Sequence, residues 1–485
     1  MKNRYILLMV LLFMTGLSFG QDQVKVWTLE ECVDYALENN LTVKRTLFGI
    51  ESNEINVKQT KWSMAPTLNF GGNYNNSWGR SIDPTTNLFT TERFETAGFS
   101  GNSSWLLFQT NRLRNTYKQA LVNLDLSKAD HETSKNSVIL GVITFYTNAV
   151  FNREQWNNTV SQLNSTERLV DRTQKQVDAG AVAQTQLFDL LAQKASNEVN
   201  VINAENNFNL SILQLKQALQ IPLNEPFEIV IPTIGVDEFQ HDGSSATDIF
   251  EVALATMPEI QSANFGLESA DLGIKIAKAQ FYPSLRLNAS LSTNYSSVRD
   301  APRRVPNGNT DPVAPFPIGT VNNDPAQGIV YTLPTTRPGF DTFESYPFGQ
   351  QFGDNISRSV GLSLSIPVFN GFAVNSNVQR AIISRSQAEI TYQERSNTLR
   401  QTIERAYNDV LASQKSYDAS EKQVEAQTES FRVTQRSFEL GAMNFIDFQV
   451  SQNNLFQANT NLLISKYDYI FKLAVLKFYQ GELNY

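Results

Sequence analysis

Two related nine-residue stretches decide the fold: Thr173-Gln174-Lys175-Gln176-Val177-Asp178-Ala179-Gly180-Ala181 and Thr434-Gln435-Arg436-Ser437-Phe438-Glu439-Leu440-Gly441-Ala442. Each ends in Gly-Ala, and the two glycines lie 261 positions apart. The same offset relates Phe108 to Phe369 and Tyr146 to Tyr407. Self-similarity at a fixed offset indicates a tandem duplication. Each copy therefore contains one helix that ends at a glycine turn.

A heptad pattern leads up to each glycine. Its members are Val142, Ala149, Trp156, Leu163, Val170 and Val177 in the first copy, and Ile403, Val410, Tyr417, Val424, Phe431 and Phe438 in the second. No proline interrupts residues 110–179 or 371–440. Six heptads predict a long coiled-coil helix over each range, roughly 100 Å in length at 1.5 Å per residue. Shorter helices are expected after the turns, at 182–220 and 442–480.

Further helices are expected before the long ones, at 41–65 and 258–282. A small helix opens each copy. In the first copy, the stretch Thr28-Leu29-Glu30-Glu31 has the pattern of a capping box, in which residues three apart satisfy each other's backbone groups.

Between the helices the hydrophobic period changes to two, as in Leu285-Arg286-Leu287-Asn288-Ala289-Ser290-Leu291. Four strands are predicted, at about 67–78, 97–108, 284–296 and 358–369. One apolar face and one small, polar face are typical of strands that lie between lipid and water. A half-exposed sheet on a soluble core is the alternative for any single strand. Because a barrel needs about eight strands, closure would require several chains.

Proline marks one segment strongly, because residues 299–348 contain nine of the 17 prolines. This composition excludes a helix or a central strand and predicts a long exposed loop. A second stretch rich in proline and turn residues predicts a connector at 222–246. The connector would join a first structural repeat at 21–221 to a second at 247–485.

The N-terminus predicts export, because Lys2 and Arg4 precede an apolar run and small residues. We expect a signal peptide at 1–20. No later stretch is long and apolar enough to predict a transmembrane helix.

Composition excludes other classes of protein. The net charge of −8 argues against nucleic acid as a partner. One cysteine and two histidines exclude disulfide frameworks and Cys/His zinc sites, so we expect no metal and no cofactor. His131 and His241 have no catalytic spacing and are expected to be solvent-facing, and the chain is not expected to be an enzyme.

The duplicated order of strands and helices resembles that of the TolC-like outer-membrane factors, as does the opening stretch Trp27-Thr28-Leu29-Glu30-Glu31-Cys32-Val33-Asp34-Tyr35-Ala36-Leu37-Glu38-Asn39-Asn40. The resemblance implies an α+β membrane protein in the outer membrane of a Gram-negative bacterium, with helices extending into the periplasm. It implies a homotrimer with a 12-stranded β-barrel, four strands per chain, continued by a long α-helical coiled-coil barrel.

The implied function is the exit duct of a tripartite efflux or type I secretion system. Its partners would be a periplasmic adaptor (membrane fusion) protein, an inner-membrane pump of RND, ABC or MFS type, and outer-membrane lipid. An exported coiled-coil scaffold or adhesin without a channel is the alternative, although it leaves the strands unexplained.

The resemblance also implies functional residues. The adaptor-contacting tips would be Gly180, Ala181, Val182, Gly441, Ala442 and Met443, with the apolar members exposed. The acidic residues Asp447 and Asp189 would line the tunnel entrance as a gate. Two structural interpretations stay open: a glycine can simply end a helix, and an aspartate early in a helix favours the positive end of the helix dipole.

Overall fold

The computed structural model describes residues 25–82, 89–91, 93–231, 243–297, 303–344 and 346–482. The predicted signal peptide and His241 lie outside these residues.

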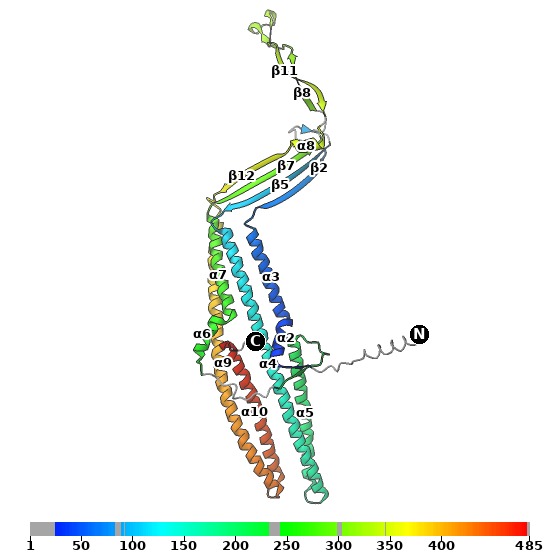
Figure 1. The fold of residues 1–485 in the computed structure, drawn as a ribbon, viewed down its shortest axis with the longest axis vertical. Coiled ribbons are helices and arrows are strands. Elements are labelled where there is room, and N and C mark those ends of the chain that lie inside the picture. The colour runs from blue at the N-terminus through cyan, green and yellow to red at the C-terminus, as the bar shows by residue number, and fades with distance from the viewer. Residues whose placement is uncertain are drawn as a thin grey trace, which may run out of the picture. The chain divides into compact units, whose positions relative to one another are not determined.

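The same order of elements occurs twice along the chain (Figure 1). The first series is α2 (Leu29–Asn39), α3 (Leu41–Trp62), β2 (Thr67–Ser77), β5 (Phe94–Phe108), α4 (Arg112–Asp178) and α5 (Gln184–Leu219). The second is α6 (Ala246–Thr256), α7 (Pro258–Lys278), β7 (Ser284–Ser296), β12 (Ser357–Ser365), α9 (Ala373–Glu439) and α10 (Phe445–Gln480). Both α4 and α9 have 67 residues, and both α5 and α10 have 36.

The compact units of the chain cut across this duplication. A helical unit contains Met1–Val57, Gln119–Asp271 and Ile382–Tyr485. A sheet unit contains Lys58–Lys118 and Leu272–Ala381. Each series of elements contributes to both units, so neither series forms a compact domain by itself.

Reciprocal capping starts the small helices of the helical unit. Thr28 accepts a hydrogen bond from the backbone N–H of Glu31, whose carboxylate accepts one from the Thr28 N–H. Ser245 and Asp248 repeat this capping box at the start of α6. The capping box predicted from sequence at Thr28 is therefore confirmed, and the second copy uses the same device.

The predicted connector also contributes a short strand. Strand β6 (Glu228–Ile229) pairs in parallel with β1 (Val26–Trp27). The Tyr146 hydroxyl of α4 donates to the carbonyl oxygen of Val230 (2.7 Å). The adjoining core includes Trp27, Cys32, Val142 and Leu215.

Heptad residues form the helical seams. Val142, Ala149, Ile403 and Val410 are almost completely buried. The other heptad positions are at least half-buried, including those nearest the glycine turns. A core of α6, α9 and α10 residues continues the seam of the second copy. Among the described residues, no helix combines the length and the apolar character required to cross a bilayer.

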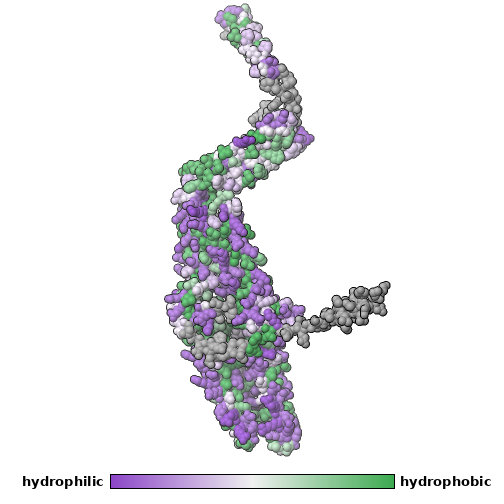
Figure 2. Space-filling model, viewed as in Figure 1, coloured by the Kyte–Doolittle hydropathy of each residue, from purple (hydrophilic) through white to green (hydrophobic). Residues whose placement is uncertain are grey.

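The sheet unit contains four antiparallel strands in the order β12-β7-β5-β2. The register places most apolar residues of the four strands on one face, including Phe70, Phe99, Leu291 and Val360, whereas Phe94 and Leu106 of β5 lie on the other face. The opposite face carries mainly Asn, Ser, Thr and Gly. Hydrophobic residues accordingly gather over these strands, whereas the helices are mostly hydrophilic at the surface (Figure 2).

The last predicted strand ends earlier than expected. The sequence predicts a strand to residue 369, but β12 ends at Ser365. Pro367 lacks the N–H that a continued ladder would require. Val368 and Phe369 therefore lie beyond the strand and are about nine-tenths exposed.

The prediction of a long loop at 299–348 is wrong in part, because two-stranded ribbons form there. Strand β8 (Arg303–Val313) pairs with β11 (Thr335–Glu344), and β9 (Pro317–Thr320) pairs with β10 (Ile329–Tyr331). Every strand of a two-stranded ribbon has one unpaired edge, so a proline that lacks a donor N–H can be accommodated there.

Other short elements were not predicted. They are the strands β3 (Ser81–Ile82) and β4 (Phe89–Thr90), the helix α8 (Phe348–Asp354), and the 3₁₀ turns η4 (Val321–Asn323) and η5 (Pro325–Gln327). Elements this short have too few residues to show a hydrophobic period. The helix expected at 258–282 ends as an α-helix at Lys278 and continues as the 3₁₀ turn η2 (Ala279–Phe281).

The reactivity of the single cysteine provides a test of how tightly the core of the helical unit is packed. Cys32 is fully buried, and desolvation raises the pKa of its thiol to about 12. We expect no reaction with a thiol reagent at pH 8 in the native protein and full reaction in denaturant, with Cys32→Ala as the blank. Rapid labelling of the native protein would contradict this burial.

The same pKa shift predicts the direction of a stability change with pH. The unfolded thiol has a pKa of about 8.5, below that of the folded thiol. The contribution of the Cys32 thiol to the free energy of unfolding is therefore fully present below the unfolded pKa of about 8.5 and is lost as the pH rises towards 12. Comparison of the native chain with Cys32→Ala across this alkaline range isolates the contribution.

Candidate functional site at the helical tips

Each long helix ends in a Schellman turn at the predicted glycine. Gly180 and Gly441 have φ of +77° and +74°, in the left-handed region. The N–H of Ala181 donates to the Gln176 carbonyl (2.8 Å), and that of Gly180 donates to the Val177 carbonyl (2.8 Å). The turn at Gly441 makes the equivalent bonds from Ala442 and Gly441. Glycine adopts this conformation without the strain of a β-carbon, so the chain can reverse within a few residues.

An aromatic cluster connects the two helical hairpins just behind their tips. Phe445 and Phe448 at the start of α10 are buried together with Leu169 of α4 and Leu190 of α5. Phe438 of α9 stacks on Phe448 with a ring-centroid distance of 4.6 Å. Because this cluster joins all four helices, both tips belong to one packed end of the helical unit.

Polar contacts extend this packing along the helices. The Gln449 side chain of α10 donates to Gln193 of α5 (3.2 Å), and Gln452 donates to Ser165 of α4 (3.1 Å). Arg172 of α4 lies 3.8 Å from Glu439 at the end of α9. Two of these three polar contacts between the hairpins are therefore made by uncharged groups.

The exposed surface at the tips differs from the prediction. Ala181 and Ala442 are exposed as expected, but Val182 and Met443 are half-buried. The positions that face solvent are larger apolar residues that the sequence analysis missed. They are Leu440, Ile446 and Val450 at the second tip, and Phe188 and Leu191 at the first.

Helical spacing could have revealed these residues. Ile446 and Val450 are four positions apart, and Phe188 and Leu191 are three apart, so each pair forms a short stripe on its helix. Each stripe lies beside a buried stripe that contains Phe445 and Phe448 in α10 or Leu187 and Leu190 in α5. Neighbouring stripes at this spacing produce helices with apolar residues on two faces.

The two predicted gate residues occupy different positions. Asp447 lies in the first turn of α10, where its backbone N–H donates to the side chain of the N-cap residue Asn444 (2.8 Å). The Asn444 amide in turn donates to the Asp447 carboxylate (2.7 Å). Asp189 lies in the second turn of α5, and both aspartates are exposed. These two hydrogen bonds hold the Asp447 carboxylate at the tip.

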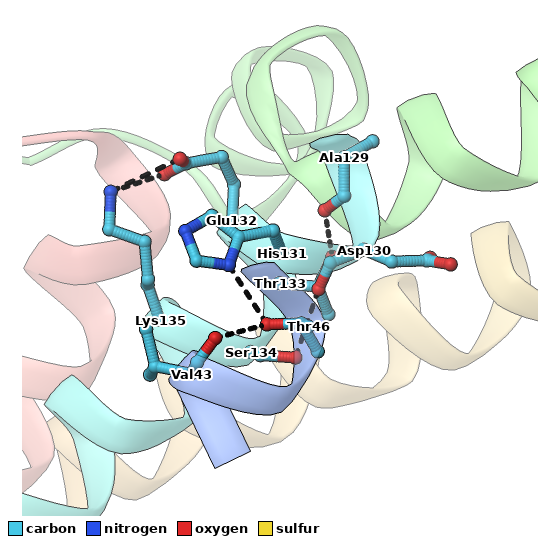
Figure 3. Close-up of polar contacts among 9 residues, drawn as sticks. All are labelled: Val43, Thr46, Ala129, Asp130, His131, Glu132, Thr133, Ser134 and Lys135. Atoms are coloured by element: carbon cyan, nitrogen blue, oxygen red, sulfur yellow. Dashed lines mark hydrogen bonds and ion pairs between the residues drawn. The ribbon is translucent and has the colours of Figure 1, made fainter. Parts of the chain in front are cut away.

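The expectation that His131 faces solvent is wrong. His131 is half-buried, and its Nδ1 lies 2.8 Å from the Thr46 hydroxyl, which also donates to the Val43 carbonyl (Figure 3). This contact connects α3 to α4. Within the described residues, no group of three or more His, Cys, Asp or Glu side chains could hold a metal ion.

Comparison with known proteins gives a family match over most of the chain. Residues 32–219 and 249–482 match the family described as "Outer membrane efflux protein". Nodulation protein T of Rhizobium leguminosarum bv. viciae is 21% identical over 454 residues, which are 92% of this chain and 81% of the relative. Outer membrane protein TolC of Escherichia coli K12 is 22% identical over 362 residues, which are 73% of this chain and 63% of TolC.

A solved structure shows the same fold. The CmeC outer membrane channel of Campylobacter jejuni superimposes with a TM-score of 0.69 at 18% identity, over 94% of this chain and 86% of CmeC. The matched family and the structural neighbour are outer-membrane channels and not enzymes.

The N-cap of α10 can be tested against that of α5. Asn444→Ala removes one side-chain acceptor and should destabilise the helix start by about 1 kcal/mol. Amide hydrogen exchange of residues 446–448 should accelerate about five-fold. The N-cap of α5, Ala183, has no side-chain hydrogen bond, so Ala183→Ser should slow exchange at that tip. Unchanged exchange in both variants would show that these caps do not stabilise the tips.

Proposed function

Because the chain belongs to the outer membrane efflux protein family, we propose that it is the exit duct of a tripartite efflux or type I secretion system. The family membership confirms the predicted resemblance and the location in the Gram-negative outer membrane, with helices extending into the periplasm. An efflux or secretion duct is the general function of this class. The finer proposal is passive conduction of substrates delivered by a periplasmic adaptor and an inner-membrane pump.

The two-faced sheet is the observation that carries the proposal. Its apolar face has the composition of a lipid-facing surface, and its other face has the composition of a water-filled lumen. On the polar face, Asn288 bridges two neighbouring strands by contacts with Ser104 (3.0 Å) and Ser363 (3.1 Å). These side chains carry no charge, satisfy one another and still offer hydrogen bonds to water. The exposed Arg286 of β7, opposite Ser363 in the register, adds a positive charge to the same face.

The sheet also supports a homotrimer. Strands β12 and β2 lie at the two edges of the four-stranded sheet. Pairing of β12 in one copy with β2 in the next removes the exposed edges, which is the advantage of a closed barrel. Three copies would supply twelve strands, above the approximately eight that a closed barrel requires.

The tips supply the surface for the adaptor. The small residues Ala181 and Ala442 allow another helical hairpin to approach closely, and the exposed side chains of Leu440 and Ile446 offer apolar area beside them. These four residues therefore offer a surface on which a hairpin of the adaptor can pack.

The entrance gate is the most specific part of the proposal. Three copies of Asp447, each held by Asn444, would form a ring of carboxylates at the tips. Such a ring attracts cations. Asp189, which lies one turn further along its helix, would add a second and weaker ring.

Conduction is tested with the purified protein in a planar bilayer. We expect trimers that form open or gateable channels. A folded trimer that never conducts would instead favour the exported scaffold or adhesin.

The charge of the gate is tested with Asp447→Asn, which keeps the backbone bond to Asn444. The preference for cations over anions should fall. The change should be larger in 0.1 M salt than in 1 M salt, because the Debye length shortens from about 10 Å to about 3 Å. Asp189→Asn serves as the matched control and should have the smaller effect. If native and Asp447→Asn channels prefer cations over anions to the same degree, the proposed role of Asp447 in the gate would be wrong.

The tip surface is tested by capture of a periplasmic adaptor from the same bacterium. Ala442→Trp should weaken capture about ten-fold or more, since overpacking costs about 1–3 kcal/mol. Ala195→Trp, at an exposed position further along α5, is the control for a bulky surface residue. Undiminished capture by Ala442→Trp would mean that the adaptor binds elsewhere.

A further inference from the structure

A short helix lies on the apolar face of the sheet and is anchored there by buried hydrogen bonds. Gln351 of α8 is completely buried. Its side-chain oxygen accepts from the Ser296 N–H (3.0 Å), and its amide donates to the Ser296 carbonyl (3.1 Å). Asn355, which ends the helix, donates to the Asn294 carbonyl (2.8 Å). These bonds fix α8 at the end of β7.

Aromatic rings complete the attachment. The Phe352 ring lies 5.3 Å from that of Phe99 on β5, and the Phe348 ring lies 5.1 Å from that of Tyr295 on β7. The Thr293 hydroxyl also donates to the Phe352 carbonyl (2.7 Å). Helix α8 therefore packs against the apolar face of the sheet over β5 and β7.

An apolar groove lies between α8 and the sheet, beside β2, β5 and β7. Its volume is about 450 Å³, and its lining includes Phe70, Phe99, Leu291, Phe352 and Ile356. Glycines allow the aromatic rings on the floor of the groove to lie close to the strands. The ring of Phe70 lies over Gly101 and the ring of Phe99 lies over Gly72, where a β-carbon would push the ring outward. The volume falls within the range of about 300–1,000 Å³ that is usual for ligand sites.

One cation stands beside this apolar groove. Arg358, the second residue of β12, is opposite Leu291 in the register and is exposed. By the register, the only acidic residue on this face of the four strands is Glu95, whose carboxylate is paired with Arg93 (3.1 Å). The Arg358 guanidinium is thus available to an anionic group whose apolar part occupies the groove.

The fold places the groove at the outer end of the sheet. Strands β5 and β12 lead into the long helices at their C-terminal ends, whereas α8 precedes β12 at the opposite end. Since the helices extend into the periplasm, the α8 end is the one nearer the external leaflet. In a Gram-negative outer membrane, that leaflet contains lipid A, a phosphorylated glycolipid with several acyl chains.

We propose that the groove beneath α8 binds one acyl chain of lipid A while Arg358 binds a lipid A phosphate. The proposal rests on the proposed function in one respect, namely that the apolar face of the sheet faces lipid. Arginine suits this role because its planar guanidinium donates two hydrogen bonds to a phosphate, and because its long side chain can reach towards the headgroups from an apolar surface.

Binding is measured by native mass spectrometry of the delipidated full-length protein in detergent, with added diphosphorylated lipid A. Arg358→Gln should weaken binding about ten-fold, as expected for one charged hydrogen-bonding partner. Arg358→Lys should restore part of the affinity. Leu291→Trp, which fills the groove, should abolish binding. Leu364→Trp, on the same face but outside the groove, is the matched control and should bind like the native protein.

Two further probes identify the source of the phosphate. Dephosphorylated lipid A should bind the native protein about as weakly as lipid A binds Arg358→Gln, and phosphatidylglycerol should bind more weakly than lipid A. Preference for phosphatidylglycerol would overturn the assignment to lipid A. Equal binding of lipid A to the native protein, Arg358→Gln and Leu291→Trp would overturn the site itself.

Bilayer conductance of the same preparations separates this proposal from the proposed function. If the protein conducts but no variant changes its binding of lipid A, the result would refute the lipid site and leave the proposed duct intact. A protein that binds lipid A through Arg358 but never conducts would support the site and refute the duct. Circular dichroism and the oligomeric state of each variant exclude misfolding as the cause of lost binding.

Discussion

The rest of the structure depends on the alternation of side chains across four antiparallel strands. Each strand presents one residue to an apolar surface and the next to a polar one, and the register aligns these faces across β12, β7, β5 and β2. A slip of one residue would move the Asn and Ser side chains to the apolar face. The stacking of Phe70 and Phe99 over glycines of the neighbouring strand helps to specify the register, because the rings require positions that lack a β-carbon.

The helical unit follows a different rule, because its seams mix apolar and polar contacts. Near Trp27 and Cys32 the core is apolar and tightly packed. Towards the tips, buried Thr166 and Asn197 form a hydrogen bond of 2.8 Å, and glutamines connect the hairpins. Paired polar groups of this kind restrict which helices can align, because a misaligned partner would leave a buried group without a hydrogen bond.

Much of this arrangement could be predicted from the sequence, because its signals are long or chemically specific. Six heptads and a glycine predict a long helix and its end, and period-two alternation predicts a strand. The ribbons within the proline-rich segment could not be predicted, because proline disfavours strands in general and only the pairing partner shows that an edge is free. The end of β12 could have been predicted more accurately, since Pro367 was visible in the sequence.

The sequence by itself determined the duplication, through motifs repeated at a fixed offset, and the long helices and strands, through their hydrophobic periods. The family was indicated by the resemblance of its motifs, because these signals depend on local preferences repeated along the chain. The tertiary structure decided which residues are exposed at the tips, that His131 contacts Thr46, and that α8 lies beside Arg358 and an apolar groove. These features depend on contacts between residues far apart in the chain. A side chain's exposure is set by what packs against it, and no local pattern contains that information.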